Sequence, residues 1–309
     1  MINRKLIRLK TVQIVYSHYL SGDGRDVKDG ESQLMQSMGA AYELYNALLL
    51  LMVEISRLAL RQYEAQIARA QRLGQPAPSR KFVDNRFMLQ LEGNRQLAHN
   101  RQSQHIDWSN EEEFVRSLLY QIMDNDFFKD YMASGDSSYE EDRELWRQIF
   151  RYVIVGNDAV DDMLEDFNLY WNDDRFIIDS FVIKTINRFS EHSDDDQPLV
   201  PEYGSDEEVE FARKLVTQAL GNDKYYQSLI AQNTRNWDME RIPLMDRVIM
   251  QVALAEITSF PTIPIVVSIN EYIDIAKAYS TPNSGKYVNA TLDNITKTLT
   301  AEHKLIKNS

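Results

Sequence analysis

Long stretches without helix-breaking residues constrain this chain more than any other sequence feature. From Glu31 to Leu73 there is no proline and only one glycine, Gly39. The whole chain of 309 residues holds only 11 glycines and 8 prolines, and no segment alternates apolar and polar residues with a period of two. Apolar side chains in this stretch recur at helical spacing, at Leu48, Leu51, Met52, Ile55, Leu58 and Ala59. The sequence therefore predicts an all-α protein with one long helix, or two nearly continuous ones, over residues 31–73.

Glycine and proline clusters divide the remaining sequence into shorter expected helices. We expect residues 80–110 to be mostly loop with marginal helix, residues 111–190 to hold several helical stretches, and residues 197–204 to form a linker. In the helix after Pro264, the spacing places Val266, Ile269, Ile273 and Ala276 on one apolar stripe. The best-defined expected helices cover residues 3–20, 206–220, 225–232, 243–257 and 265–279, and a last helix contains Val288, Leu292, Ile295 and Leu299.

Several classes of chemistry have no support in the sequence. The absence of cysteine excludes a disulfide scaffold, a thiolate zinc site and a cysteine nucleophile. The five histidines show no metal-ligand spacing, and no nucleophile elbow, phosphate-binding loop or zinc-protease motif is present. The longest apolar run, Ala47 to Val53, is far shorter than a membrane span of about 20 residues. We therefore expect a cytoplasmic protein that is not an enzyme, has no cofactor, metal or catalytic residue, and does not contact a membrane.

The net charge of −13 is unevenly distributed. Residues 1–110 carry 15 Lys and Arg against 10 Asp and Glu, residues 111–210 carry 8 against 28, and residues 211–309 carry 11 against 9. The acidity thus belongs to the middle third, and its local clusters are expected to be solvated loops. The basic ends remain compatible with a nucleic-acid partner.

The first expected helix has a basic sector. At about 100° per residue, Arg4, Lys5 and Arg8 fall within roughly 100° of one another, and Tyr16 lies close to the Lys5 line. Cations that contact phosphates beside an aromatic ring are typical of single-stranded nucleic-acid binding. The alternative is an ordinary basic solvent face with a half-buried tyrosine. Lys10 points away from this sector.

Three spaced motifs stand out in the C-terminal third. They are Asp246–Ile257, then Ile269-Asn270-Glu271 with Ala276-Lys277, then Ser284–Asn289 with Leu292-Asp293, and they extend upstream through Phe211–Leu215 and Asn236-Trp237. These motifs resemble the C-terminal signature of the NusB transcription antitermination family. The basic first helix, with Val12-Gln13 and Tyr16-Ser17, is also similar to that of the family, and together the similar parts cover about 115 of 309 residues.

The resemblance implies a fold and a function. The fold is a NusB-like double helical bundle, here with an inserted additional helical region. The function is transcription antitermination and its regulation, through RNA binding to the boxA segment of ribosomal RNA leaders together with the ribosomal protein NusE, which helps RNA polymerase in the antitermination complex avoid premature termination. By position, the RNA-binding residues would be Arg4, Lys5, Arg8, Gln13 and Tyr16 from the first helix, and Tyr279, Asn283, Ser284, Lys286 and Tyr287 from the last turn and helix.

The sequence departs from the family in three ways. Leu6 and Leu9 occupy places that are often charged, and Asn283 replaces an acid that often precedes the Ser-x-Lys element. Residues 22–205 form an insertion between two parts of the RNA-binding core, residues 1–21 and 206–300, and residues 301–309 are a tail. The insertion could be a protein docking surface, a negatively charged screen of the RNA face, or an elaboration that only stabilises the fold.

Two other functions and one partner state stay open at this stage. The chain could be a helical protein-interaction module in ribosome biogenesis with lost or weakened RNA binding. It could also be the RNA-binding domain of a ribosomal RNA methyltransferase, which would need an α/β domain after the matching part, whereas about ten residues follow Leu299. A homodimer is not excluded.

Overall fold

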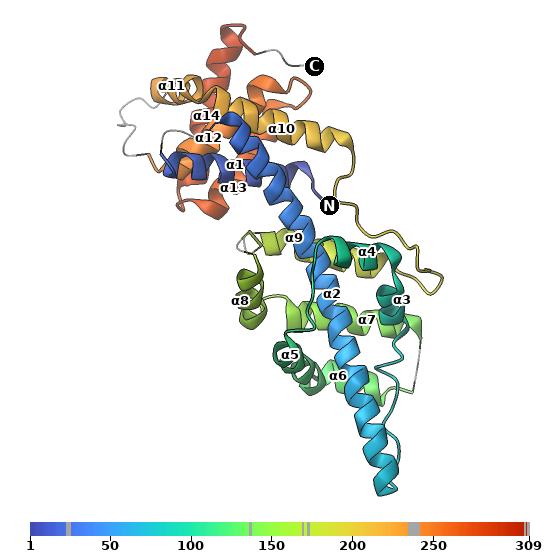
Figure 1. Ribbon diagram of the computed structural model, residues 1–309. Coiled ribbons are helices and arrows are strands. Elements are labelled where there is room, and N and C mark those ends of the chain that lie inside the picture. Colours follow the sequence, from blue (N-terminus) through green and yellow to red (C-terminus); the bar gives the residue numbers. More distant parts are fainter. Residues whose placement is uncertain are drawn as a thin grey trace. The chain divides into compact units, whose positions relative to one another are not determined.

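The computed structural model is built from helices throughout its described part, which confirms the all-α prediction. The structure describes residues 1–22, 26–135, 138–168, 170–171, 174–233, 242–305 and 307. Within these ranges it contains 14 α-helices and one π-helical turn, and none of these helices combines the length and apolarity needed to cross a membrane (Figure 1). The elements are α1 (Arg4–Leu20), α2 (Val27–Leu73), α3 (Arg86–Gly93), α4 (Arg95–Ser103), α5 (Glu112–Asp124), α6 (Asp126–Ala133), α7 (Tyr139–Ile149), η1 (Phe150–Ile154), α8 (Asp158–Phe167), α9 (Arg175–Arg188), α10 (Asp206–Gly221), α11 (Asp223–Asn233), α12 (Leu244–Ser259), α13 (Ile265–Tyr279) and α14 (Ser284–Ala301).

The chain forms two compact units. Unit 1 comprises Met1 and residues 40–202, and unit 2 comprises residues 2–39 and 203–309. By sequence, unit 1 carries 17 Lys and Arg against 30 Asp and Glu, whereas unit 2 carries 17 against 17. The whole net charge of −13 therefore belongs to unit 1. The domain boundaries expected after residues 21, 205 and 300 stay a prediction.

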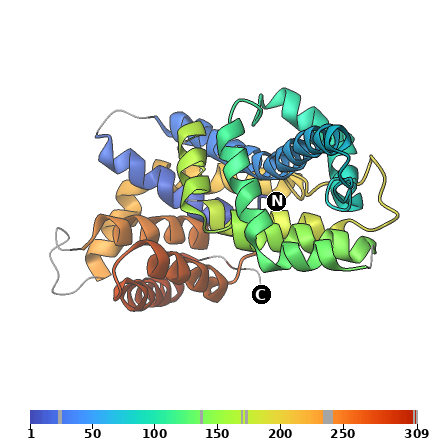
Figure 2. The same ribbon diagram turned by 90° about the horizontal axis from the view of Figure 1, so that it is seen from below.

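Unit 1 is organised around α2. Between Ala40 and Ala59 this helix is buried on nearly every face, and the other helices of the unit lie around it (Figure 2). The indole N–H of Trp108 donates to the carbonyl oxygen of Ala47 at 2.8 Å, which seats an aromatic side chain directly on the helix. A helix that is apolar all round is typical of a position at the centre of a core.

The prediction that residues 80–110 are mostly loop is wrong. Two helices, α3 and α4, occupy much of this segment, and each begins after a buried asparagine. Asn85 accepts from the backbone N–H of Met88, and Asn94 accepts from that of Leu97, both at 3.0 Å. Asparagine is a strong N-cap, so these two residues were the sequence signal for the helices.

Unit 2 is organised around α12. Every residue from Val248 to Ile257 is buried, and α1, α10, α11, α13 and α14 all pack against this helix. On α13 the expected stripe is only partly right, because Val266 is 64% exposed and Ile273 is half-buried. The buried face of α13 is instead Ser268, Ile269, Tyr272, Ile275 and Ala276. Asn236 and Trp237 lie outside the described residues.

Candidate nucleic-acid interface

A buried carboxylate fixes the turn that leads into α14. Asp246, in the first turn of α12, is 2% exposed and accepts hydrogen bonds from the hydroxyls of Ser280 at 2.6 Å and Ser284 at 2.9 Å. The backbone N–H of Thr281 in turn donates to the Ser284 hydroxyl at 3.1 Å. These bonds tie the start of α14 to α12. Ser284, expected to contact RNA, is itself only 1% exposed and therefore positions the turn instead of presenting its hydroxyl to solvent.

Glycine is required at the second residue of α14. A Cβ added to Gly285 would lie 2.9 Å from Cγ of Lys277 and 3.6 Å from Cγ2 of Ile273. The missing side chain lets the first turn of α14 approach α13 closely. The glycine of the Ser-Gly-Lys sequence is therefore explained by helix packing, whether or not the sequence also contacts a ligand.

A hollow of about 550 Å³ lies beside this turn. At the start of α14, the hollow is lined by two exposed polar side chains, Asn283 and Lys286. The acidic residue of the lining, Asp246, is buried. The side chain of Asn283 makes no capping hydrogen bond to α14, so its amide is available to a ligand. Within the described ranges no carboxylate lies within an ion-pair distance of 4.0 Å of Lys286. The hollow is lined by Ile242, Pro243, Asp246, Thr281, Asn283, Ser284, Lys286 and Tyr287.

The electrostatics of this turn favour an anion outside it. The first turn of α14 contains no acidic residue, and the N-terminus of a helix presents backbone N–H groups and a partial positive charge. Lys286 adds a full positive charge at the same end. Burial raises the pKa of Tyr287, a hydrogen bond to Thr291 opposes this shift, and the charge of Asp246 adds to it. The phenol therefore stays neutral, and its ring is an uncharged wall of the hollow.

The start of α1 also presents cations. Asn3 caps the helix by accepting from the backbone N–H of Leu6 at 3.0 Å, and Arg4 and Lys5 in the first turn are exposed. The guanidinium of Arg4 lies 5.3 Å from the ring centroid of Phe211. Cations at a helix N-terminus oppose the helix dipole, so these two residues weaken α1 slightly and are better explained by a ligand than by helix stability.

Arg8 was expected at the RNA face, and the structure corrects this expectation. The residue is 4% exposed, and its guanidinium forms two hydrogen bonds of 2.8 Å with the carboxylate of Glu256, which is fully buried. Ser268 at 2.7 Å and Tyr272 at 3.0 Å donate to the same carboxylate. Burial lowers the pKa of Arg8, but the hydrogen bonds and charge of Glu256 outweigh it and raise the pKa overall. Arg8 is an internal cation that joins α1 to α12.

The remaining expected residues are spread along unit 2. Gln13 and Tyr16 are half-buried on α1, and Tyr279 is 40% exposed at the end of α13. Arg8 meets α12 at Glu256, whereas Ser284 meets it at Asp246. Ten residues of helix separate these two contacts, or about 15 Å at 1.5 Å per residue. The ten expected residues therefore do not form a single cluster.

Sequence reasoning missed four residues of the hollow: Ile242, Pro243, Asp246 and Thr281. Asp246 opens the motif that runs to Ile257, so its place in that motif was a usable signal. The pairing of its carboxylate with two serine hydroxyls across a gap of more than thirty residues had no local signal.

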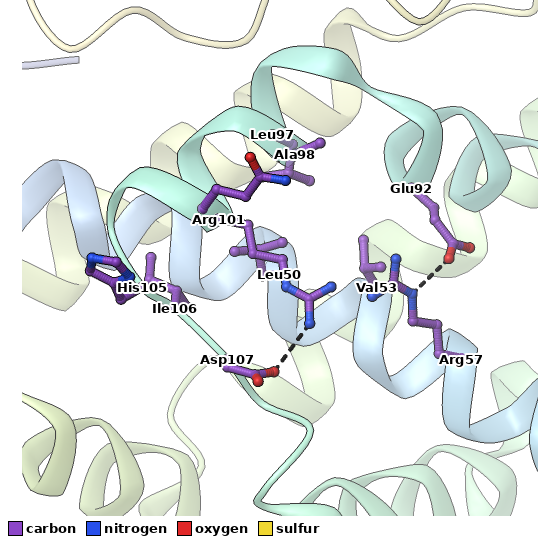
Figure 3. A pocket seen from close by; sticks show the side chains of 11 residues that line it. Leu50, Val53, Arg57, Glu92, Leu97, Ala98, Arg101, His105, Ile106 and Asp107 are labelled. Atoms are coloured by element: carbon purple, nitrogen blue, oxygen red, sulfur yellow. Dashed lines mark hydrogen bonds and ion pairs between the residues drawn. The ribbon is translucent and has the colours of Figure 1, made fainter.

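Unit 1 contains a separate hollow of about 530 Å³ (Figure 3). Two arginines line it, but each has a carboxylate partner: Arg57 meets Glu92 at 2.6 Å, and Arg101 meets Asp107 at 3.1 Å. Its charges are therefore balanced pairwise, and none of the residues expected to bind RNA lines it. Across the part of the chain that the structure describes, no group of three or more His, Asp or Glu side chains is arranged to hold a metal ion.

Comparison with known proteins identifies the region that contains the α14 turn. The model of the NusB family matches residues 177–297. This span holds most of α9 and α10 through α13, and it reaches into α14, but it leaves out α1 and hence five of the ten expected residues. A solved structure of Thermotoga maritima NusB shares 27% identity over 44% of this chain and 83% of that chain, with a TM-score of 0.30.

Three proteins named transcription antitermination protein NusB are similar in sequence. The protein of Dictyoglomus thermophilum is 37% identical over 87 residues, or 28% of this chain and 60% of its own length. That of Salinibacter ruber is 36% identical over 98 residues, or 32% and 61%. That of Bacillus mycoides is 38% identical over 94 residues, or 30% and 72%. The chain thus spans less than two thirds of the first two relatives and more than two thirds of the third. It belongs to the NusB family.

Proposed function

We propose that this chain is a non-enzymatic transcription antitermination factor. It would bind boxA-type RNA of ribosomal leaders together with the ribosomal protein NusE and help RNA polymerase avoid premature termination. The relatives named transcription antitermination protein support the general role. The observation that carries the RNA contact is the start of α14, where an exposed lysine, a free asparagine amide and a hollow lie together inside the matched span.

The geometry of this turn fits a nucleotide. Lys286 and the backbone N–H groups of the first turn suit a phosphate, and the half-buried ring of Tyr287 beside Pro243 offers an apolar wall to a base. The Asn283 amide can both donate to and accept from a base edge. An asparagine at this place, instead of an acid, also spares the phosphate a nearby negative charge.

Replacement of Lys286 tests this contact. Lys286→Ala should weaken binding to a boxA RNA and reduce the slope of log K against log salt by about 0.7, the value for one lost phosphate contact on single-stranded RNA. The matched control is Lys297→Ala, which removes an exposed lysine of the same helix that pairs with Asp293 at 2.6 Å. Anisotropy titrations of the full chain from low to high salt measure both quantities. If the two variants give the same affinity and slope, Lys286 is not part of the site.

One observation favours a second function, a protein-interaction module with weakened RNA binding. Arg8, Leu6 and Leu9 are all buried, so the first two turns of α1 leave only Arg4 and Lys5 as exposed cations. This surface is thin for a polyanion. Under this alternative, boxA and scrambled RNA would bind equally and weakly, whether or not NusE is present.

A further inference from the structure

The C-terminal part of α2, in unit 1, carries an exposed arginine-rich surface that the proposed function does not use. We define it as the distal arm, residues 60–80, which comprises the last turns of α2 and the segment that follows them. These turns extend past the other helices of unit 1, and the following segment returns alongside them (Figure 1). Tyr63 anchors the arm, since its ring lies 5.2 Å from the guanidinium of Arg80 and its hydroxyl donates to the carbonyl oxygen of Pro78 at 3.4 Å.

The arm is positively charged within an acidic unit. No acidic residue occurs between Glu64 and Asp84, although unit 1 carries 30 acidic residues in all. At 100° per residue, Arg61, Arg69 and Arg72 fall within about 80° of one another, and they span roughly 16 Å along the helix. All three are exposed. One face of the arm is therefore a row of guanidinium groups.

Among the described residues, two of these cations lack an acidic partner, although the guanidinium of Arg72 donates to the carbonyl oxygen of Ala68 on its own helix at 3.3 Å. Arg61 meets Glu54 at 3.1 Å, whereas within the described ranges no carboxylate lies within 4.0 Å of Arg69 or Arg72. Small exposed side chains, Ala65 and Ala68, lie between Arg61 and Arg69, which lets another molecule approach the helix closely. The positive potential of Arg69 and Arg72 is thus available to a ligand.

The composition of the face selects the kind of partner. A protein interface needs a central apolar or aromatic anchor. The exposed apolar side chains of the arm, Leu60 (37%) and Leu73 (57%), lie outside the arginine sector at 100° per residue. The nearby aromatic rings of Tyr63 and Phe82 are each only 6% exposed. Apart from Glu64 and Ser79, the polar residues that accompany the arginines are glutamines, which can donate hydrogen bonds to phosphate and ribose oxygens. An extended chain of phosphodiesters, bound without a sequence requirement, fits this surface better than an acidic protein.

We infer that the distal arm binds the RNA phosphate backbone without sequence preference, through Arg69 and Arg72, as a second contact separate from the α14 turn. The choice of RNA among polyphosphates rests on the proposed function, whereas the arm geometry does not depend on boxA recognition.

Charge reversal in the full chain tests the inference. The arm variant is Arg69→Glu with Arg72→Glu. The control variant is Arg151→Glu with Lys184→Glu, which changes the net charge equally at two exposed positions elsewhere in unit 1. The probes are a fluorescent 30-nucleotide oligouridine RNA, a short boxA RNA and a labelled polyglutamate peptide, each titrated by anisotropy at several salt concentrations.

Loss of two single-strand phosphate contacts should reduce the salt slope for oligouridine by about 1.4, which corresponds to roughly 25-fold weaker binding near 0.1 M salt. The control variant should change neither quantity by a comparable amount. Equal affinities of the arm and control variants for oligouridine would overturn the inference. Loss of polyglutamate binding with unchanged RNA binding would also overturn it, in favour of an acidic protein partner.

Failure of this inference and failure of the proposed function give different results. If the wild-type chain binds oligouridine through the arm but does not prefer boxA RNA, the arm contact stands and the proposed function fails. If it prefers boxA RNA and the arm variant binds oligouridine as the control does, the proposed function stands and the arm contact fails. A milder variant, Arg69→Gln with Arg72→Gln, should show the same direction with a smaller loss.

Discussion

Removal of the buried cation at Arg8 should destabilise unit 2 strongly. The carboxylate of Glu256 is fully buried, and Arg8 donates two of its hydrogen bonds. Among the described hydrogen-bond and ion-pair partners of Glu256, Arg8 is the only one with a positive charge. In Arg8→Met the stem volume is largely kept, but the carboxylate keeps only the hydroxyl donors Ser268 and Tyr272. An uncompensated buried charge of this kind costs about 3–5 kcal/mol.

The double variant separates charge from packing. In Arg8→Met with Glu256→Gln, the amide oxygen can still accept from Ser268 and Tyr272, and no charge is left buried. Most of the loss should therefore be recovered, because replacement of a whole buried ion pair is often close to neutral. The matched single control is Arg4→Met, which removes an exposed cation beside the same Phe211 ring and should cost at most about 1 kcal/mol.

Hydrogen exchange at increasing urea concentrations measures this effect within one unit. Peptides from α12 report the opening free energy of unit 2, and peptides from α7 in unit 1 serve as an internal reference. The expected result is a large loss for α12 in Arg8→Met, with no change for α7 and no change in the salt slope of RNA binding. The reasoning is refuted if Arg8→Met and Arg4→Met lower the α12 opening free energy equally.

Two further changes have defined outcomes. Ser284→Ala leaves the buried carboxylate of Asp246 with one donor fewer. The opening free energy of α14, measured by hydrogen exchange at increasing urea concentrations, should therefore fall by about 1–3 kcal/mol. An unchanged opening free energy would contradict the role given to that hydroxyl. Burial raises the pKa of Asp179 to about 6 from 3.8, although Arg175 lies 3.2 Å away and opposes the shift. Because the folded-state pKa is the higher one, protonation of Asp179 favours folding, and this contribution is lost as the pH rises from about 4 to 6. As the pH rises over this interval, the opening free energy of unit 1 should therefore fall more in the wild type than in Asp179→Asn. Parallel pH profiles of the two proteins would refute the assignment.

Helix positions could be predicted because their signals are local. Pro243 was expected to begin a helix, and α12 starts directly after it at Leu244. The Thr281 to Gly285 turn was expected to separate two helices, and α14 begins within it at Ser284. Each boundary depends on a breaker or capping residue within a few positions, so the sequence contains the information in one place.

The orientation of individual side chains could not be predicted in the same way. A helical wheel places Arg8 on the same sector as Arg4, but it cannot show that Arg8 binds the carboxylate of Glu256, 248 residues later in the chain. The same limitation applies to Ser284, whose partner Asp246 lies on another helix. Periodicity identifies a face, whereas burial depends on which element covers that face. The exposed members stay predictions as RNA contacts, and so do the half-buried Gln13, Tyr16 and Tyr287. The exposed members are Arg4, Lys5, Tyr279, Asn283 and Lys286.

The preference for boxA RNA tests the central claim most directly. The full chain is titrated into a labelled boxA RNA and into a scrambled RNA of the same length and composition, with and without NusE, at one fixed salt concentration. The proposed function predicts tighter binding to boxA RNA and a further increase of that preference when NusE is present. Equal, weak binding to both RNAs under all four conditions would contradict it.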